Sequence, residues 1–133
     1  MENRDGLIWF DGEFVDWKNA NIHILNHGLH YASSVFEGER SYSGKIFKVR
    51  EHTERLFNSA DALDLKIPYS VDQIIDASYQ SIKLNNLEDA YLRPIVWRGS
   101  EMGVSAPDAK VHCAIAVWEW PSYFTPEEIL KGI

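Results

Sequence analysis

The chain has 133 residues, enough for one small domain that buries roughly two thirds of the surface exposed by its unfolded chain. Hydrophobic residues make up 45% and charged residues 25% of the sequence, which is ordinary for a globular protein and argues against disorder. The net charge of −7 and the pI of about 5.1 argue against nucleic acid or an anionic membrane as the main partner, because both require a basic footprint.

A single cysteine, Cys113, excludes an intrachain disulfide and a CxxC-type metal site. It lies in the apolar segment VHCAIAVW, which favours a buried thiol. The N-terminus has no charged region followed by an apolar run, and no stretch approaches the ~20 apolar residues that a membrane helix needs. We therefore expect a cytoplasmic protein without a membrane span.

The first third of the chain predicts two hairpins. Residues 7–10 and 13–17 are short apolar runs on either side of Asp11-Gly12, a strong signal for a hairpin with a type I′ turn. Residues 19–30 have no clean period and predict a long ordered loop. A strand over residues 34–42 then turns at Ser43-Gly44 and returns along residues 45–49.

The middle third changes to a helical period. Residues 51–63 predict a helix with one apolar face, and its first turn carries negative charge that the helix dipole favours; the face is formed by His52, Leu56, Ala60 and Leu63. Ser70 can cap a second helix that ends at Asn85-Asn86. The core stripe of this second helix is Val71, Ile74, Ile75, Ser78 and Ile82.

The last third returns to strands. Residues 90–98 and 111–118 are rich in β-branched and aromatic side chains, and the second segment is apolar enough to be a central strand. Pro94 cannot donate to a sheet ladder and so predicts either an edge strand or a local break. Thr125 can cap a short helix. The expected fold class is α+β, an antiparallel sheet with two helices packed on one side.

The strand over residues 34–42 carries polar and aromatic residues on both of its faces. Alternation places Val35, Glu37, Glu39 and Ser41 on one face, and on the other Ser34, Phe36, Gly38, Arg40 and Tyr42. An aromatic ring, a bare glycine and an arginine on one face are typical of the wall of a polar cleft, where glycine lets a ligand approach the backbone. The alternative is a mixed hairpin strand near the surface.

Two arginines are candidates for binding an anion. Arg55 on the first helix can grip a phosphate with two hydrogen bonds, or it can pair with Glu51 one helical turn earlier. Arg93 shares a strand face with Tyr91, and the two can bind a substrate carboxylate, although Arg93 can also cover the sheet edge with its aliphatic stem. The residues alone leave both alternatives open.

Other chemistry has little support. The five histidines show neither HExxH nor tetrahedral metal-site spacing, so we expect no metal. The sequence lacks GxSxG, GxGxxG and P-loop motifs, which removes the usual signals for a serine hydrolase or a nucleotide-binding protein.

Four strings, HYASSVFEGER, EHTERL, AYLRPIVWRGSEMGV and AVWEWPSYF, resemble the branched-chain aminotransferases of the class IV, D-amino-acid-transaminase-like fold. The resemblance runs from about Ile8 to the end. It implies pyridoxal 5′-phosphate as cofactor, and amino-group transfer between leucine, isoleucine or valine and 2-oxoglutarate. It also implies amino acids and 2-oxo acids as small-molecule partners, and a homodimer or higher homo-oligomer.

The same resemblance assigns roles to individual residues. It makes Arg55 the arginine that binds the cofactor phosphate. It implies three groups of substrate-binding residues. The first lines the pocket and consists of Phe36, Gly38, Arg40, Tyr91 and Arg93. The second, Tyr31 and the Met102-Gly103-Val104 loop, reaches the pocket of the partner subunit, and the third, Trp120 and Tyr123, lies at the start of the interdomain linker. Glu39 stands where many relatives carry an aliphatic residue, but it falls on the opposite strand face, so we expect little effect on the pocket.

No lysine in the sequence matches the Schiff-base lysine of the family, so we expect no catalytic residue in this chain and place that lysine beyond Ile133. Residues 1–120 are then the small N-terminal domain and residues 121–133 begin the interdomain linker. Two rivals remain: another class IV enzyme, namely D-amino-acid transaminase or aminodeoxychorismate lyase, and a freestanding non-catalytic binding domain.

Overall fold

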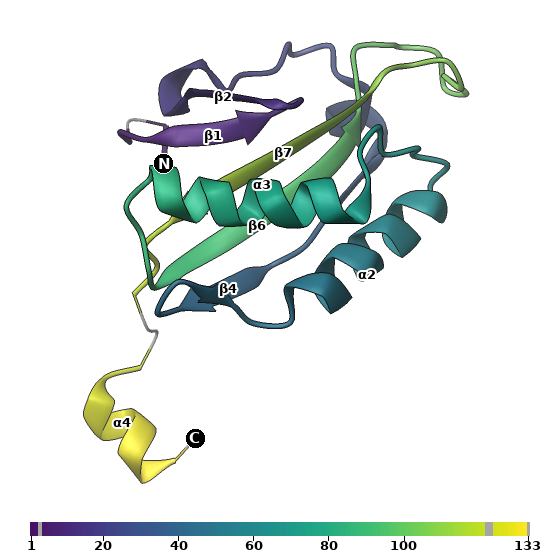
Figure 1. Cartoon of the computed structure of the whole chain (residues 1–133). Helices are drawn as coiled ribbons and strands as arrows, with labels where there is room; N and C mark the ends of the chain where they lie inside the picture. The colour runs from purple at the N-terminus through teal and green to yellow at the C-terminus, as the bar shows by residue number, and fades with distance from the viewer. Residues whose placement is uncertain (3, 122–123, 133) are drawn as a thin grey trace.

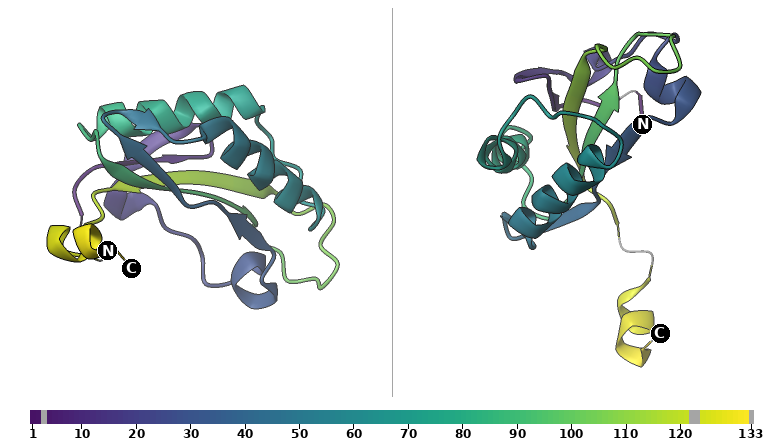
Figure 2. Two further views of the ribbon diagram at one scale, coloured as in Figure 1. Left: turned by 90° about the horizontal axis from the view of Figure 1, so that it is seen from below. Right: turned by 90° about the vertical axis from the view of Figure 1, so that its right-hand side faces the viewer.

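A computed structural model describes residues 1–2, 4–121 and 124–132. Its centre is an antiparallel sheet with the order β2-β1-β7-β6-β4-β5, and β3 also pairs with β6 (Figure 1). Helices α2 and α3 cover one face of this sheet, as the edge-on view in Figure 2 shows. The expected α+β class, with two helices on an antiparallel sheet, is confirmed.

The N-terminal hairpin forms as the sequence predicts. Strands β1 (Leu7–Phe10) and β2 (Glu13–Asp16) pair around a turn in which Asp11 and Gly12 both have positive φ, 49° and 96°. Positive φ at both central residues is the requirement of a type I′ turn. The second strand ends one residue before the expected limit, because a 3₁₀ turn, η1 (Trp17–Asn19), follows it.

The expected loop over residues 19–30 is wrong at its end, since it runs into a short helix, α1 (His27–Tyr31). The side chain of Asn26 accepts a hydrogen bond from the Gly28 N–H at 3.1 Å and so caps this helix. Asparagine before an irregular segment was the available signal. One turn of helix is too short to produce a period in the sequence.

The strand expected over residues 34–42 is divided into β3 (Ser34–Phe36) and β4 (Glu39–Tyr42), which both pair with β6 (Ala90–Arg98). The Glu37 N–H donates to the Pro94 carbonyl at 2.9 Å, but proline has no N–H to return the bond. The register is the same on both sides of the interruption, with Phe36 opposite Ile95 and Glu39 opposite Leu92. The chain therefore keeps its alternation of faces across the break.

This arrangement also decides between the two expectations for Pro94. It is not on an edge strand, because β6 pairs from Tyr91 to Arg98 with β7 (Val111–Trp118), and with β3 and β4 on its other side. The local break is the closer alternative, but it lies in the neighbouring strand, between β3 and β4, whereas β6 itself is unbroken over Ala90–Arg98. Strand β7 lies between β1 and β6, as expected of a central strand.

The remaining boundaries shift by a few residues. Strand β5 is only Lys45–Ile46, because α2 (Val49–Asp61) begins two residues earlier than expected. The helix also ends two residues earlier, so Leu63 lies outside it and is exposed. Helix α3 (Val71–Leu84) begins at a complete capping box, in which Ser70 and Gln73 each accept a backbone N–H of the other. Helix α4 (Pro126–Lys131) follows Thr125 as expected, and all its residues are exposed.

The sheet has two different faces. Leu92, Val96, Cys113, Ile115 and Val117 point to α2 and α3 and form the main core with Leu56 and Ile74. The intervening residues of β6 and β7 point to the other face, where Ile8, Trp97 and Ala114 make a smaller cluster. Cys113 is fully buried as expected, and its burial raises the pKa of the thiol to about 12.

Candidate functional site

A group of polar and aromatic side chains lies on the face that α2 and α3 leave open. Arg93 donates from Nη2 to the hydroxyl of Tyr91 at 2.7 Å, and its guanidinium carbon lies 4.3 Å from the centre of the Phe36 ring. Phe36 comes from the neighbouring strand and is 58% exposed. The three predicted residues are therefore in contact, and Arg93 meets an aromatic face and a neutral hydroxyl rather than a carboxylate.

Arg40 extends this group toward the C-terminal part of the chain. It lies opposite Tyr91 in the sheet and donates from Nη1 to the Trp120 carbonyl at 3.2 Å. The Trp120 ring contacts Tyr91 with a centroid distance of 4.9 Å. Trp118, which was not among the predicted site residues, contacts the Tyr91 and Trp120 rings with centroid distances of 5.0 and 5.6 Å. It lies opposite Tyr91 in β7, and its spacing of two residues from Trp120 was the sequence signal that could have identified it.

Gly38 lies beside this group and is exposed. A Cβ atom built at this position would come within 2.5 Å of the Tyr91 hydroxyl oxygen. A side chain there would move the hydroxyl that Arg93 contacts, so the absence of a side chain is a geometric requirement of the Tyr91–Arg93 pair.

Arg55 lies on the helix side, in contact with Glu37 rather than with Glu51. Its Nε and Nη2 donate to the two oxygens of the Glu37 carboxylate, both at 2.6 Å. Glu51 instead contacts Lys48 at 3.3 Å, so the simple surface pair between Arg55 and Glu51 is wrong. The hydrogen bonds and charge of Glu37 raise the pKa of Arg55, which keeps it a fixed cation.

Glu37 is buried, with 4% of its surface exposed, and it also contacts Nδ1 of His52 at 2.9 Å. Burial alone would raise its pKa, but the hydrogen bonds and charges of Arg55 and His52 hold the pKa of Glu37 below its usual value. The group is an ionised carboxylate with donors on both oxygens.

Glu39 is on the same strand face two residues further on and is 2% exposed. Neither of its carboxylate oxygens has a hydrogen-bond partner in the part of the chain that the structure describes. Burial, together with the charge of Glu37, raises the pKa of Glu39 to about 8. Because Glu39 shares the buried strand face with Glu37, the expectation that it faces away from Phe36 is correct.

The residues expected to reach a partner subunit lie together at the opposite end of the sheet, where β6 ends and β7 begins. The Tyr31 hydroxyl donates to the Met102 carbonyl at 3.2 Å, and Nε2 of His27 lies 3.2 Å from the Gly103 carbonyl oxygen. Val104 follows in the same loop and is strongly exposed. Arg40, Tyr91 and Trp120 are at the other end, so the chain does not bring the two groups together.

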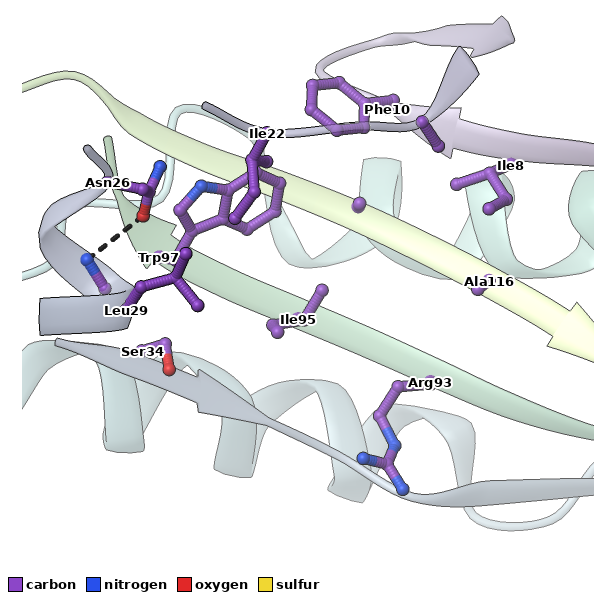
Figure 3. A pocket seen from close by; sticks show the side chains of 13 residues that line it. Ile8, Phe10, Ile22, Asn26, Leu29, Ser34, Arg93, Ile95, Trp97 and Ala116 are labelled. Carbon is purple, nitrogen blue, oxygen red and sulfur yellow. Dashed lines mark hydrogen bonds between the residues drawn. The ribbon is translucent and has the colours of Figure 1, made fainter. Parts of the chain in front are cut away.

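Between these ends, the open face contains an apolar pocket of about 320 Å³. Figure 3 shows Arg93 at one end of the pocket and Asn26 with Leu29 at the other. The wall between them is formed by Ile8, Phe10, Ile95, Trp97, Ala114 and Ala116. This pocket was not predicted from the sequence because its residues come from β1, α1, β3, β6, β7 and the segment before α1.

Three further expectations concern Tyr123, metal binding and membrane spans. Tyr123 lies outside the described residues. Within the described ranges, no group of three or more His, Cys, Asp or Glu side chains could hold a metal ion. Among the helices of those ranges, none has the length and apolar character needed to span a membrane.

Comparison with known proteins agrees with the strings quoted from the sequence. The model of the family described as "Amino-transferase class IV" matches residues 34–132. The chain belongs to the class IV aminotransferases. The family match covers both the Phe36–Arg93 group and the Glu37–Arg55 pair.

Within this family, the chain is similar to several branched-chain aminotransferases. A branched-chain-amino-acid aminotransferase of Pseudomonas aeruginosa is 48% identical over the whole of this chain and 45% of the relative. The crystal structure of the Escherichia coli branched-chain amino acid aminotransferase superposes with a TM-score of 0.87 at 38% identity, over 93% of this chain and 43% of that one. A third enzyme of this name, solved as a complex with N-(5′-phosphopyridoxyl)-L-glutamate, gives 0.83 at 36% identity, over 88% and 41%. The chain thus spans less than half the length of these relatives.

Proposed function

We propose that this chain is part of a branched-chain aminotransferase, which transfers the amino group of leucine, isoleucine or valine to 2-oxoglutarate with pyridoxal 5′-phosphate. Its relatives are branched-chain aminotransferases, which supports the reaction, and the related enzyme complexed with phosphopyridoxyl-glutamate supports the cofactor and one substrate. In this proposal residues 1–120 are the small N-terminal domain, residues 121–133 begin the linker, and the cofactor lysine lies beyond Ile133. The enzyme is a cytoplasmic homodimer or higher homo-oligomer.

The arrangement of Arg93 carries the substrate proposal. One site must accept both the carboxylate tail of glutamate and the apolar tail of leucine, and a buried cation left unpaired with leucine bound would cost several kcal/mol. Tyr91 and Phe36 give the guanidinium a hydrogen bond and an aromatic contact when no carboxylate is present. Arg93 can then bind the side-chain carboxylate of glutamate, and it does not weaken the binding of leucine.

Arg55 fits the cofactor phosphate. A guanidinium has two edges that can each make paired hydrogen bonds, and Glu37 occupies the Nε–Nη2 edge. In the described part of the chain Nη1 makes no hydrogen bond to protein, and the side chain is 66% exposed. When bound, the cofactor stabilises the carbanion at the substrate Cα and carries the amino group between donor and acceptor.

The other proposed residues shape and close the site. Phe36 and Trp120 offer aromatic surface to a substrate side chain, Arg40 holds the backbone of Trp120, and Gly38 leaves room for the Tyr91 hydroxyl. Tyr31 and the Met102-Gly103-Val104 loop, with its carbonyls already held by Tyr31 and His27, act in the pocket of the partner subunit.

Arg93→Ala in the full-length enzyme tests this proposal. We expect kcat/KM for glutamate and 2-oxoglutarate to fall by roughly one to three orders of magnitude, while the leucine half-reaction changes much less. Single-turnover kinetics with each amino donor measure the two halves separately. An equal loss with leucine and glutamate would mean that Arg93 holds the fold or the shared α-carboxylate instead.

A further inference from the structure

The contact between Glu37 and Arg55 joins the segment between β3 and β4 to the predicted phosphate-binding residue on α2. The chain neighbours of Glu37, Phe36 and Gly38, lie on the open face, whereas the side chain of Glu37 itself points to the helices. There the carboxylate meets the guanidinium with both oxygens at 2.6 Å. This is the paired geometry that gives guanidinium–carboxylate contacts their orientation.

From this we infer that Glu37 is a positioning residue, which orients Arg55 for the phosphate group of the cofactor; the inference rests on the proposed function. Arg55 is a long side chain and 66% exposed, so without a fixed partner it would sample several rotamers. Glu37 removes that freedom, because it is 4% exposed and its own N–H is bound to the Pro94 carbonyl at 2.9 Å. A rigid strand therefore orients a flexible helical side chain.

The chemistry of the contact explains why the guanidinium remains available. The carboxylate takes the Nε–H and one Nη2–H, which leaves the Nη1–Nη2 edge for the paired oxygens of a phosphate. His52 takes part through Nδ1, 2.9 Å from the Glu37 carboxylate and 3.3 Å from Nη2 of Arg55. With its proton on Nδ1, His52 donates to Glu37 and fixes the carboxylate from a second side.

The strand break at Pro94 places this contact next to the substrate residues. Glu37 and Gly38 are the two residues between β3 and β4, and they point to opposite faces. Gly38 lies against the Tyr91 hydroxyl, and Glu37 lies against Arg55. One dipeptide thus adjoins the proposed phosphate-binding residue on one face and the proposed carboxylate-binding pair on the other.

Ligand binding to the apo form of the full-length enzyme tests the inference, with pyridoxamine 5′-phosphate and unphosphorylated pyridoxamine as probes. For Glu37→Gln we expect the Kd of the phosphorylated probe to rise by roughly tenfold and that of pyridoxamine by less than about twofold, because charge-assisted hydrogen bonds that orient the guanidinium are lost. Fluorescence titration measures both constants. The ³¹P resonance of the bound phosphate should shift in the same variant.

Glu39→Gln is the matched control, since it replaces a buried carboxyl on the same strand face that has no contact with Arg55. It should leave both dissociation constants unchanged. An equal loss for the two probes in Glu37→Gln, or the same selective loss in Glu39→Gln, would show a general disturbance of the strand and overturn the positioning role.

Arg55→Lys separates this inference from the proposed function. Lysine keeps the charge but lacks the planar fork, so Arg55→Lys should weaken the phosphorylated probe, and adding Glu37→Gln should then weaken it no further. Unchanged affinity in Arg55→Lys and Arg55→Ala would overturn the phosphate role of Arg55 and the role of Glu37 with it. A loss in the Arg55 variants alone, with none in Glu37→Gln, would overturn only the positioning role.

Discussion

The two faces of the sheet are built from alternate residues of the same strands, and they differ in almost every physical respect. In β6, Leu92 and Val96 are fully buried under α2 and α3, whereas Arg93 and Ile95 lie on the open face and are only partly buried. The helix side is a packed apolar core, and the open side combines an apolar pocket with exposed polar and aromatic groups. The period of two in a β-strand allows one segment to contribute to a packed core on one face and to line a pocket on the other.

The largest expected effect comes from the helix side. Leu92→Ala removes a fully buried side chain and leaves a cavity, so we expect the free energy of unfolding to fall by ~2–5 kcal/mol. Chemical denaturation of the 133-residue chain measures it. Ile95→Ala, three residues along and on the open face, should cost about 1 kcal/mol because the residue is only partly buried. Equal losses for the two variants would mean that both faces contribute equally to stability.

Glu39 is a buried carboxyl on the helix side with no hydrogen-bond partner among the described residues, and it gives a prediction of intermediate size. Its pKa is about 8 in the folded chain, above the value of 4.5 for an unperturbed glutamate. Between these values the folded state holds a proton that the unfolded state has lost, so stability falls as pH rises from about 4.5 to 8 and then levels off. Glu37, whose pKa is lowered, has the opposite sign and loses its contribution as pH falls.

Glu39→Leu should therefore stabilise the chain by roughly 1–3 kcal/mol at about pH 8 and by little at about pH 4.5. Unfolding free energies measured from about pH 4.5 to about pH 9 for both proteins give the difference directly. A constant difference across this range would show that Glu39 is not the titrating group.

The smallest effect on stability belongs to the open face. Gly38→Ala should change the free energy of unfolding by less than about 1 kcal/mol, because the new Cβ meets only the movable end of the Tyr91 side chain. The displaced hydroxyl can no longer accept the Arg93 hydrogen bond, so on the proposed function we expect KM for glutamate to rise by roughly three- to tenfold. Ser34→Ala, on the same face at the start of β3, is the control and should leave KM unchanged. A destabilisation as large as that of Leu92→Ala would contradict the division between the two faces.

Most of the fold followed from local signals in the sequence. Asp11-Gly12 predicted the type I′ turn, Ser70 the start of α3, and the alternation from Ser34 to Tyr42 the assignment of those residues to two strand faces. These features depend on backbone preferences and side-chain periods, which act over a few residues. The short helix α1 was missed because a single turn leaves no period.

The candidate site could be predicted only in part from such local signals. The sequence motifs selected Arg55, Tyr91 and Arg93, but the contact partners of Arg55 and the apolar pocket depend on residues that are distant in the sequence. Glu37 and Arg55 are brought together because α2 packs against the end of β3. Whether Pro94 lies at an edge or beside a break depended on which strands pair with β6.

The sequence by itself determined the local elements, the faces of the strands and the family motifs, because each of these is encoded by neighbouring residues. Only the tertiary structure decided that Arg55 is oriented by Glu37 rather than by Glu51, and that Glu39 is buried without a partner among the described residues. A helix period predicts contacts along one helix, but it contains no information on which strand the helix packs against. Burial and ion pairing across elements are therefore properties of the packed sheet and helices together.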